Sequence, residues 1–470
     1  MSTVEERQIL RFLRSQDQVN IELGFQLCIG RGKVYGEAVK RALQQHVDLC
    51  EKYDFEPTFV ENYREVKALL YKGKIEQAFK HYAQTGEYYG EEVSERFQSH
   101  PLLCAKYQVE LTHLRQVKNL TITYQDREII FDLTRFAKLI TLEISGYPLR
   151  KTIQDIGALI HLKRLYLIGN DLVKLPAEMK YLENLRALTI DSNRITGLPN
   201  ELQGLKRLHQ LNLIENNFQA LPINICNLSA LIGLYIRANP LQSIPIEISR
   251  LKKLRQLIVL NAELKSIPKE IGQLPSLRVL NLGRNDLSDL PTEITQLEGL
   301  QELGLQSNKF DKFPLMVTKL LQLQILYLSY NNISYVPVKL ARLKTLKVLN
   351  LHGNKIRKIP PKISRLSNLT TLNLGNNKLT DLPIELGDLD KLRHLNLDYN
   401  QLTALPLVIF RLRNLRYLHL RGNQLTHLPL KVDNLSLPKL KVLVLRRNPI
   451  SEEEQKRIRK ALPKCRVYFN

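Results

Sequence analysis

Hydrophobic residues recur along most of this chain with a period of 23 residues. One copy of the pattern, which also holds Asn377 and Pro383, places apolar side chains at Leu369, Leu372, Leu374, Leu379, Leu382, Leu386 and Leu389. The step of two between Leu372 and Leu374 is typical of a short β-strand with one buried face. The remaining apolar positions predict a helical or irregular return, so each copy is expected to form one strand and one return segment.

An asparagine marks the end of each predicted strand, and it lapses once, to Ala262. It recurs at Asn170, Asn193, Asn216, Asn239, Asn285, Asn308, Asn331, Asn354, Asn377, Asn400 and Asn423. Its side-chain amide can donate and accept hydrogen bonds, so we expect it to bond the backbone of its own and the neighbouring turn. Stacked copies would then form a ladder of amides that is interrupted at Ala262. A proline six residues later, from Pro176 to Pro429, fixes φ where the chain leaves the strand.

A single copy of this pattern buries too little apolar surface to fold alone, so successive copies must stack on one another. Stacking predicts an α/β fold: a right-handed solenoid, shaped as an arc or horseshoe, with a concave parallel β-sheet and the returns outside. We expect the array to span residues 116–448, with about 14 repeats. Degenerate copies around Leu120 and Leu142 begin the array, and a copy that ends at Asn448 closes it.

Two segments that flank the array lack the repeat. Residues 1–115 contain apolar runs at helical spacing, punctuated by glycines, and are predicted to form a small α-helical N-terminal domain or cap. Residues 449–470 are predicted to form a C-terminal helical cap over the open end of the solenoid. Ser451 and Glu454 fit a capping box at the start of its helix, and residues 467–469 fit a last strand.

The frame between residues 139 and 448 resembles the leucine-rich repeat proteins of the intracellular 23-residue class, and is similar to Ras-group-related and bacterial cytoplasmic members. The resemblance implies an arc whose concave face binds another protein. Members of this class act in scaffolding, small-GTPase signalling or phosphatase regulation. A small GTPase or a phosphatase is therefore a partner that only the resemblance implies. The run from Asn448 to Glu454 likewise resembles a family end cap.

Positive charge is concentrated in the array. Residues 1–116 carry 16 Lys and Arg against 17 Asp and Glu, whereas the rest of the chain carries 53 against 29. Eight of these cations share one position before the central strand leucine, at Lys163, Arg186, Arg255, Arg278, Lys347, Arg393, Arg416 and Lys441. Because neighbouring strands lie about 4.8 Å apart, these cations would form a discontinuous ridge along one margin of the sheet. The ridge could keep the array soluble or attract an acidic partner, and it lacks the interleaved aromatics that favour nucleic acid.

Composition also predicts a compartment. The first residues lack the basic and apolar character of a secretion signal, and no apolar run reaches membrane-spanning length. The five cysteines are far apart in the sequence, as expected of reduced thiols. These features predict a cytoplasmic protein without a membrane span.

Functional residues are expected among the strand side chains that face outward, because packing occupies the framework positions. The first candidate cluster mixes aliphatic, aromatic and arginine side chains, as protein-binding hot spots do, and consists of Ile214, Tyr235, Arg237, Ile258 and Leu260. The second is a polar and aromatic patch that consists of Asp398, Tyr399, Tyr417, His419, Arg421 and Arg446. Strand propensity alone explains any single aromatic or branched residue, so the prediction rests on the clusters.

The sequence contains no catalytic signature, cofactor motif or metal-site spacing. The glycines between Gly30 and Gly36 lack the Gly-Lys-Ser/Thr end of a phosphate loop. His352 and His419 lie three copies apart, about 14 Å by strand spacing, which is too far to share a metal ion. We therefore predict a non-catalytic scaffold or adaptor for intracellular signalling that binds a protein partner on the concave sheet. The alternative is an effector or targeting protein whose N-terminal domain carries an unrecognised activity that the array delivers. A third hypothesis is electrostatic adhesion to an anionic polymer or membrane, which should be lost steeply as salt is added.

Overall fold

The computed structural model describes residues 9, 11, 13–14, 37–43, 77–78, 117–123, 133–147, 149, 152–429 and 437–469. The chain forms two compact units, Met1–Leu162 and Lys163–Asn470. Sixteen strands follow one another in sequence order in a parallel sheet, as the predicted solenoid requires.

The smaller unit contains the weak first copies of the repeat. Its described elements are α3 (Glu37–Leu43), β1 (Asn119–Thr123), η2 (Leu133–Arg135), β2 (Thr141–Ser145) and η3 (Thr152–Ala158), where η denotes a 3-10 helix. β1 pairs with β2 in parallel, and Leu120 lies opposite Leu142, so the expected degenerate strands are present. Most of the predicted helical domain at residues 1–115, including the glycine-rich run from Gly30, lies outside the described residues.

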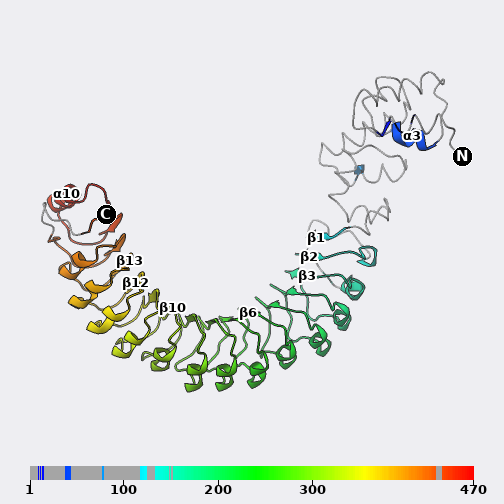
Figure 1. Ribbon diagram of the computed structural model, residues 1–470, viewed down its shortest axis with the longest axis horizontal. Coiled ribbons are helices and arrows are strands. Elements are labelled where there is room, and N and C mark those ends of the chain that lie inside the picture. Colours follow the sequence, from blue (N-terminus) through cyan, green and yellow to red (C-terminus); the bar gives the residue numbers. More distant parts are fainter. Residues whose placement is uncertain are drawn as a thin grey trace. The chain divides into compact units, whose positions relative to one another are not determined.

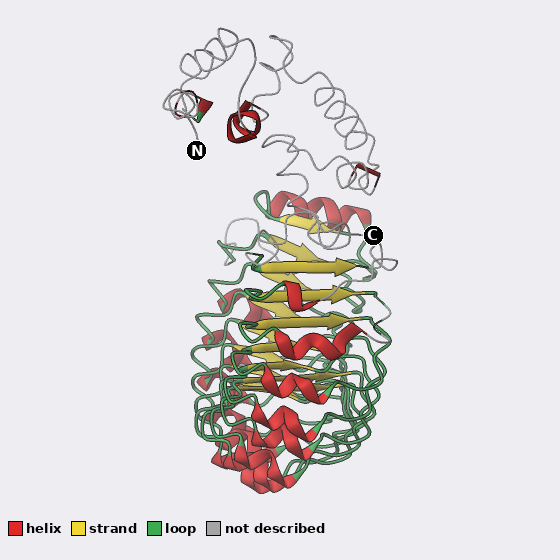
Figure 2. Ribbon diagram, turned by 90° about the vertical axis from the view of Figure 1, so that its right-hand side faces the viewer, coloured by secondary structure: helices red, strands yellow, loops and turns green. Residues whose placement is uncertain are grey.

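The larger unit consists of strands that alternate with 3-10 returns. Its strands are β3 (Arg164–Ile168), β4 (Ala187–Thr189), β5 (Gln210–Asn212), β6 (Gly233–Arg237), β7 (Gln256–Leu260), β8 (Val279–Asn281), β9 (Glu302–Gly304), β10 (Ile325–Tyr327), β11 (Val348–Asn350), β12 (Thr371–Asn373), β13 (His394–Asn396), β14 (Tyr417–His419), β15 (Val442–Val444) and β16 (Arg466–Tyr468). Within this unit the strands line the concave side of an arc and the returns form its convex side (Figure 1). The strands run side by side in one direction (Figure 2).

The returns are short 3-10 helices that begin directly after the repeated proline. They are η4 (Ala177–Tyr181), η5 (Asn200–Gly204), η6 (Ile223–Asn227), η7 (Ile246–Arg250), η8 (Lys269–Gln273), η9 (Thr292–Gln296), η10 (Leu315–Lys319), η11 (Val338–Arg342), η12 (Pro361–Arg365), η13 (Ile384–Asp388) and η14 (Leu407–Arg411). The preceding prolines have φ between −59° at Pro222 and −75° at Pro337, the range that the pyrrolidine ring imposes. The prediction that proline marks the turn is confirmed.

The leucines of the frame form the core, as predicted. In the copy that contains Asn377, the residues Leu369, Leu372 and Leu374 are at most 1% exposed. Residues 23 positions apart face each other across paired strands, so Leu372 contacts the leucine layer of both neighbouring copies. Each repeat is therefore buried by the next one, and the core is linear.

The asparagine ladder is present, and it is interrupted where the sequence predicts. Asn377 accepts the N–H of Ile356 at 3.0 Å and donates to Leu351 O at 2.9 Å, which links two turns. Ala262 has no such amide. The N–H of Leu241, which would have met an asparagine there, donates instead to Asn239 O at 2.8 Å within its own turn.

The C-terminal segment contains the predicted helix and strand. α10 (Glu452–Ala461) is capped by Ser451, whose Oγ accepts the N–H of Glu454 at 3.2 Å. In place of the reciprocal bond of a capping box, the Glu454 carboxylate accepts the N–H of Leu428 at 2.8 Å and pairs with Arg457 at 2.6 Å. These bonds tie α10 to the repeat that ends near Leu428. The role of the segment as a cap stays a prediction.

Candidate functional site

The central one of the three outward-facing positions of each strand affects the shape of the concave face. Its side-chain oxygen accepts the N–H two residues further on, at 2.8 to 3.1 Å, at Asn281, Asn350, Asn373 and Asn396. These four strands are three residues long. Tyr235 and Ile258 have no amide at the same position, and β6 and β7 extend to five residues. The sheet is therefore longer along the strand direction at this pair.

The first predicted cluster, Ile214, Tyr235, Arg237, Ile258 and Leu260, lies on this pair and is called the β6–β7 cluster. Tyr235 faces Ile258 and Arg237 faces Leu260 across the two strands, and Ile214 follows β5 on the other side of β6. Arg237 is exposed and the other four side chains are half-buried. The structure therefore brings all five residues onto one surface with an apolar centre.

Tyr235 is held against the sheet from two sides. A Cβ atom on Gly233 would come within 2.7 Å of the Tyr235 ring, so the ring lies over the space that the glycine leaves. The Tyr235 hydroxyl donates to the side-chain oxygen of Gln256 on β7. Burial raises the pKa of Tyr235, so the hydroxyl remains a hydrogen-bond donor at neutral pH. A preoriented aromatic ring loses little side-chain entropy on contact with a ligand.

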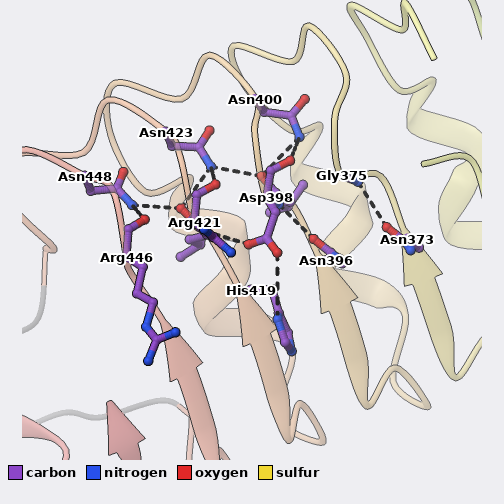
Figure 3. A network of polar contacts seen from close by, with 12 residues as sticks. Asn373, Gly375, Asn396, Asp398, Asn400, His419, Arg421, Asn423, Arg446 and Asn448 are labelled. Carbon is purple, nitrogen blue, oxygen red and sulfur yellow. Dashed lines mark hydrogen bonds and ion pairs between the residues drawn. The ribbon is translucent and has the colours of Figure 1, made fainter. Parts of the chain in front are cut away.

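The second predicted cluster, Asp398, Tyr399, Tyr417, His419, Arg421 and Arg446, is called the C-terminal cluster and is centred on the Asp398 carboxylate. Oδ1 of Asp398 accepts the N–H of Arg421 at 2.6 Å, and Oδ2 lies 3.9 Å from Nδ1 of His419. The N–H of Asp398 itself donates to Oδ1 of Asn396 at 2.8 Å. Figure 3 shows the carboxylate between His419 and Arg421, with the ladder amides at the strand ends.

Tyr399 is fixed as an exposed aromatic residue beside this carboxylate. Its backbone is left-handed, with φ of 51°, and its ring covers Gly422. The Arg421 guanidinium carbon lies 5.4 Å from the ring centroid, within the range of a cation–π contact. Nη1 of Arg447 donates to the Tyr399 hydroxyl at 3.3 Å. Two arginines and one tyrosine therefore form a single rigid polar edge.

Two predicted residues of the C-terminal cluster lie at its margin. The Arg446 guanidinium lies 5.7 Å from the ring of Tyr468 on β16, and Figure 3 shows it pointing away from Asp398. Tyr417 stacks on His394, with ring centroids 4.5 Å apart and an angle of 10° between the planes. Sequence reasoning left His394 and Tyr468 out of the cluster. His394 is directly opposite Tyr417, 23 residues earlier, so the repeat period would have revealed it.

Burial shifts the pKa values of titratable groups in and beside both clusters. It raises the pKa of Asp398, while the N–H of Arg421 and nearby positive groups act in the opposite direction. The same arrangement recurs beside the β6–β7 cluster, where Asp191 accepts the N–H of Ile214 at 3.1 Å and burial raises the pKa of Asp191. Burial, with the positive charges around it, lowers the pKa of His394, so this ring is neutral at pH 7.

The positive charge of the array lies mostly outside these outward columns. The three outward positions of β3 to β15 and their extensions hold four arginines and three acids, namely Arg164, Arg237, Arg421, Arg446, Asp191, Glu302 and Asp398. The predicted basic ridge is present at the sheet margin near the C-terminal cluster. There Arg393, Arg416 and Lys441 follow one another on adjacent strands, joined by backbone hydrogen bonds of 2.8 Å. Attraction of an acidic partner by this ridge stays a prediction.

Comparison with known proteins assigns the family. A leucine-rich repeat model matches residues 160–218, 253–310, 344–402 and 392–450, and a two-copy leucine-rich repeat model matches 321–364. A leucine-rich repeat protein of Leptospira interrogans is 36% identical, and the match covers 76% of this chain and 97% of that one with a TM-score of 0.70. The chain belongs to the leucine-rich repeat family. No curated protein matches it in sequence.

Two further solved structures share the leucine-rich repeat fold. An internalin of Listeria monocytogenes is 26% identical over 73% of this chain and 92% of that one, with a TM-score of 0.59. The ectodomain of the plant membrane receptor kinase GASSHO1/SCHENGEN3 from Arabidopsis thaliana, in complex with Casparian strip integrity factor 2, is 26% identical. That match covers 72% of this chain and 42% of the plant chain, with a TM-score of 0.55. The fold is typical of non-enzymatic interaction modules.

In the part of the chain that the structure describes, no helix combines the length and the apolar character that crossing a bilayer requires. The intracellular 23-residue class, the Ras-group likeness and the cytoplasmic location remain predictions.

Proposed function

We propose that this leucine-rich repeat protein is a non-catalytic scaffold or adaptor that holds a protein partner on its concave sheet. The observation that carries the proposal is the β6–β7 cluster, where half-buried apolar side chains surround the exposed Arg237 on a pair of five-residue strands. Aromatic and aliphatic anchors beside an arginine are the composition of protein-binding hot spots. The complex of the plant receptor ectodomain with Casparian strip integrity factor 2 supports a binding role for the fold.

The distance between the two clusters sets a minimum length for a partner that contacts both. Six strand steps separate β7 from β13, which corresponds to about 29 Å at the usual spacing. A partner that contacts both clusters is therefore a folded domain or an extended segment of at least that length. The β6–β7 cluster supplies apolar anchorage, and the C-terminal cluster supplies directional donors from Arg421 and Arg446.

The charges on the concave face favour a partner with acidic or acceptor groups. Arg237 is exposed on β6, and Arg446 is exposed shortly after β15. By resemblance alone, a small GTPase or a phosphatase acting in intracellular signalling is the class of partner to test first, in the cytoplasm. The rival function, an activity carried by residues 1–115, would be refuted if a chain without them kept its partner and its cellular phenotype.

The test is capture of a partner from the native cell extract, followed by identification of the captured protein by mass spectrometry. The variant Arg237→Glu with Ile258→Asp is expected to lose the partner, because it places a buried charge at the apolar anchor and reverses the adjacent cation. The matched control, Arg250→Glu with Ile246→Asp, makes the same two changes of residue type at exposed positions of η7 on the convex side, and is expected to keep the partner. Unchanged capture by the folded β6–β7 variant, or equal loss with the control, would refute the location.

A further inference from the structure

One block of the array contains no acidic residue. Residues 312–380 hold no Asp or Glu and twelve cations, which are Lys312, Lys319, Lys339, Arg342, Lys344, Lys347, Lys355, Arg357, Lys358, Lys362, Arg365 and Lys378. All twelve are exposed, and within the described residues none of them forms an ion pair. Outside the block the pattern differs, because Lys309 pairs with Asp286 at 2.9 Å and Arg411 of η14 pairs with Asp388 of η13 at 2.5 Å. The cations of the block are therefore available to an external anion.

A row of exposed apolar residues begins in the same block on the convex side and continues through the next two returns beyond it. It is formed by the first residue of each of the five returns η10 to η14, and consists of Leu315, Val338, Pro361, Ile384 and Leu407. All five are exposed, and the exposed fraction reaches 62% at Ile384 and 69% at Leu407. These returns lie on the outer side of the arc, in its yellow to orange part (Figure 1). Even Leu315 and Val338 are 39% and 48% exposed, so a large part of each side chain is left in solvent and not packed within the array.

The neighbouring position shows that the fold does not dictate this chemistry. The second residue of the return is acidic in five of the six returns η4 to η9, at Glu178, Glu201, Glu247, Glu270 and Glu293. The equivalent residue is Lys339 in η11 and Lys362 in η12, and it is acidic again, Glu385, in η13. Both charges are compatible with the same 3-10 helix in the same frame. The change of sign is therefore a property of the surface and not of the framework.

We propose that this convex patch, formed by the apolar row with Lys319, Lys339, Arg342, Lys362 and Arg365, docks the array on an anionic lipid surface. The aliphatic side chains would enter the interface between headgroups and acyl chains, and the lysines and arginines beside them would contact lipid phosphates. This site is separate from the concave face and does not depend on the proposed partner.

Three observations favour a lipid surface over a protein or a nucleic acid. The apolar residues are distributed one per repeat along a row of exposed returns, which suits a broad flat surface. The row is aliphatic, so it offers no ring for base stacking. The patch is limited to five adjacent returns, and only adjacent returns on the convex side of an arc can meet a flat surface together (Figure 1).

The electrostatic part is tested with the full chain and vesicles of phosphatidylcholine, with and without phosphatidylserine. The variant Lys339→Glu with Lys362→Glu installs the residue that six other returns carry, so the fold is expected to persist. Each lost cation weakens binding to an anionic surface about fivefold, so the pair is expected to lose about 25-fold or more in cosedimentation. The control Lys174→Glu with Lys265→Glu makes the same change in net charge at exposed lysines outside the block, and is expected to change binding less than about fivefold.

The apolar part separates a lipid surface from a soluble anionic partner. The variant Ile384→Ser with Leu407→Ser is expected to weaken binding to phosphatidylserine vesicles about tenfold or more and to leave binding to soluble polyglutamate unchanged. Its control, Ile223→Ser with Ile246→Ser, alters residues at the same position of η6 and η7 that are 53% and 59% exposed. The proposal is overturned if the native chain ignores phosphatidylserine, or if either control matches its patch variant. Equal vesicle binding by the Ile384 and Leu407 variant would instead assign the patch to an acidic polymer or protein.

Discussion

The asparagine ladder allows a direct test of how the repeats hold together, through the substitution Asn377→Ala. Oδ1 of Asn377 accepts the N–H of Ile356 at 3.0 Å, and Nδ2 donates to the carbonyls of Leu351, Leu374 and Gly375 at 2.9 to 3.1 Å. Alanine leaves the Ile356 N–H buried without its acceptor, which costs about 1 to 3 kcal/mol. The lost amide donor adds about 0.5 to 1.5 kcal/mol. The expected loss of unfolding free energy is therefore about 1.5 to 4.5 kcal/mol.

The natural alanine at position 262 shows how this cost could be avoided. There the N–H of Leu241 donates to Asn239 O within its own turn. The residue between them, Pro240, has no N–H that would need an acceptor. The turn at Ile356 differs, because the N–H of Lys355 donates to the preceding repeat at 2.8 Å and holds the turn in position. We therefore expect no equivalent rearrangement in the Asn377→Ala protein.

The assay combines urea unfolding, followed by circular dichroism, with hydrogen exchange of the segment that contains Ile356. The control is Asn332→Ala, an exposed asparagine whose side chain makes no hydrogen bond to any described residue. The control is expected to change stability by less than about 0.5 kcal/mol. A loss of the same small size for Asn377→Ala, with Ile356 still protected from exchange, would refute the view that the ladder carries stability between repeats.

Two further predictions concern single turns. Gly422→Ala is expected to cost about 1 to 3 kcal/mol, because φ is +66° and the new Cβ would lie 2.5 Å from the Tyr399 ring. Gly197→Ala, with nothing within 4 Å of the new Cβ, is the control in the same urea titration, and equal losses would contradict the explanation. The hydrogen bond from Arg457 lowers the pKa of Glu454 below its ordinary value of 4.5, so this carboxylate stabilises α10 above that pH and less as the pH falls. The protection factors of residues 451–469 against hydrogen exchange should therefore fall below pH 4.5, and Glu454→Gln should reduce that dependence.

The framework could be predicted because every copy buries apolar side chains, mostly leucines, at the same positions of the repeat. Buried leucines such as Leu372 keep the strand register, and the interval of 23 residues places each one opposite its counterpart. For the C-terminal cluster, the repeat period predicted which residues lie near one another, but not which polar contacts they make. The direction in which Arg446 turns depends on Tyr468, a residue on β16 outside the regular repeat period. Side-chain rotamers of this kind are set by local neighbours that the period does not encode.

The departures from the frame also rank the two clusters. Pro240 removes a backbone donor, Ala262 removes the ladder amide, and Gln242 takes a left-handed φ of 56° in the turn between them. A sequence under selection for stability alone would restore the asparagine, since eleven other copies keep it. The same two repeats carry the apolar side chains of the β6–β7 cluster on their extended strands. Sites at which a protein departs from its own local rule are expected to be functional, so the β6–β7 cluster is the first place at which to seek the partner.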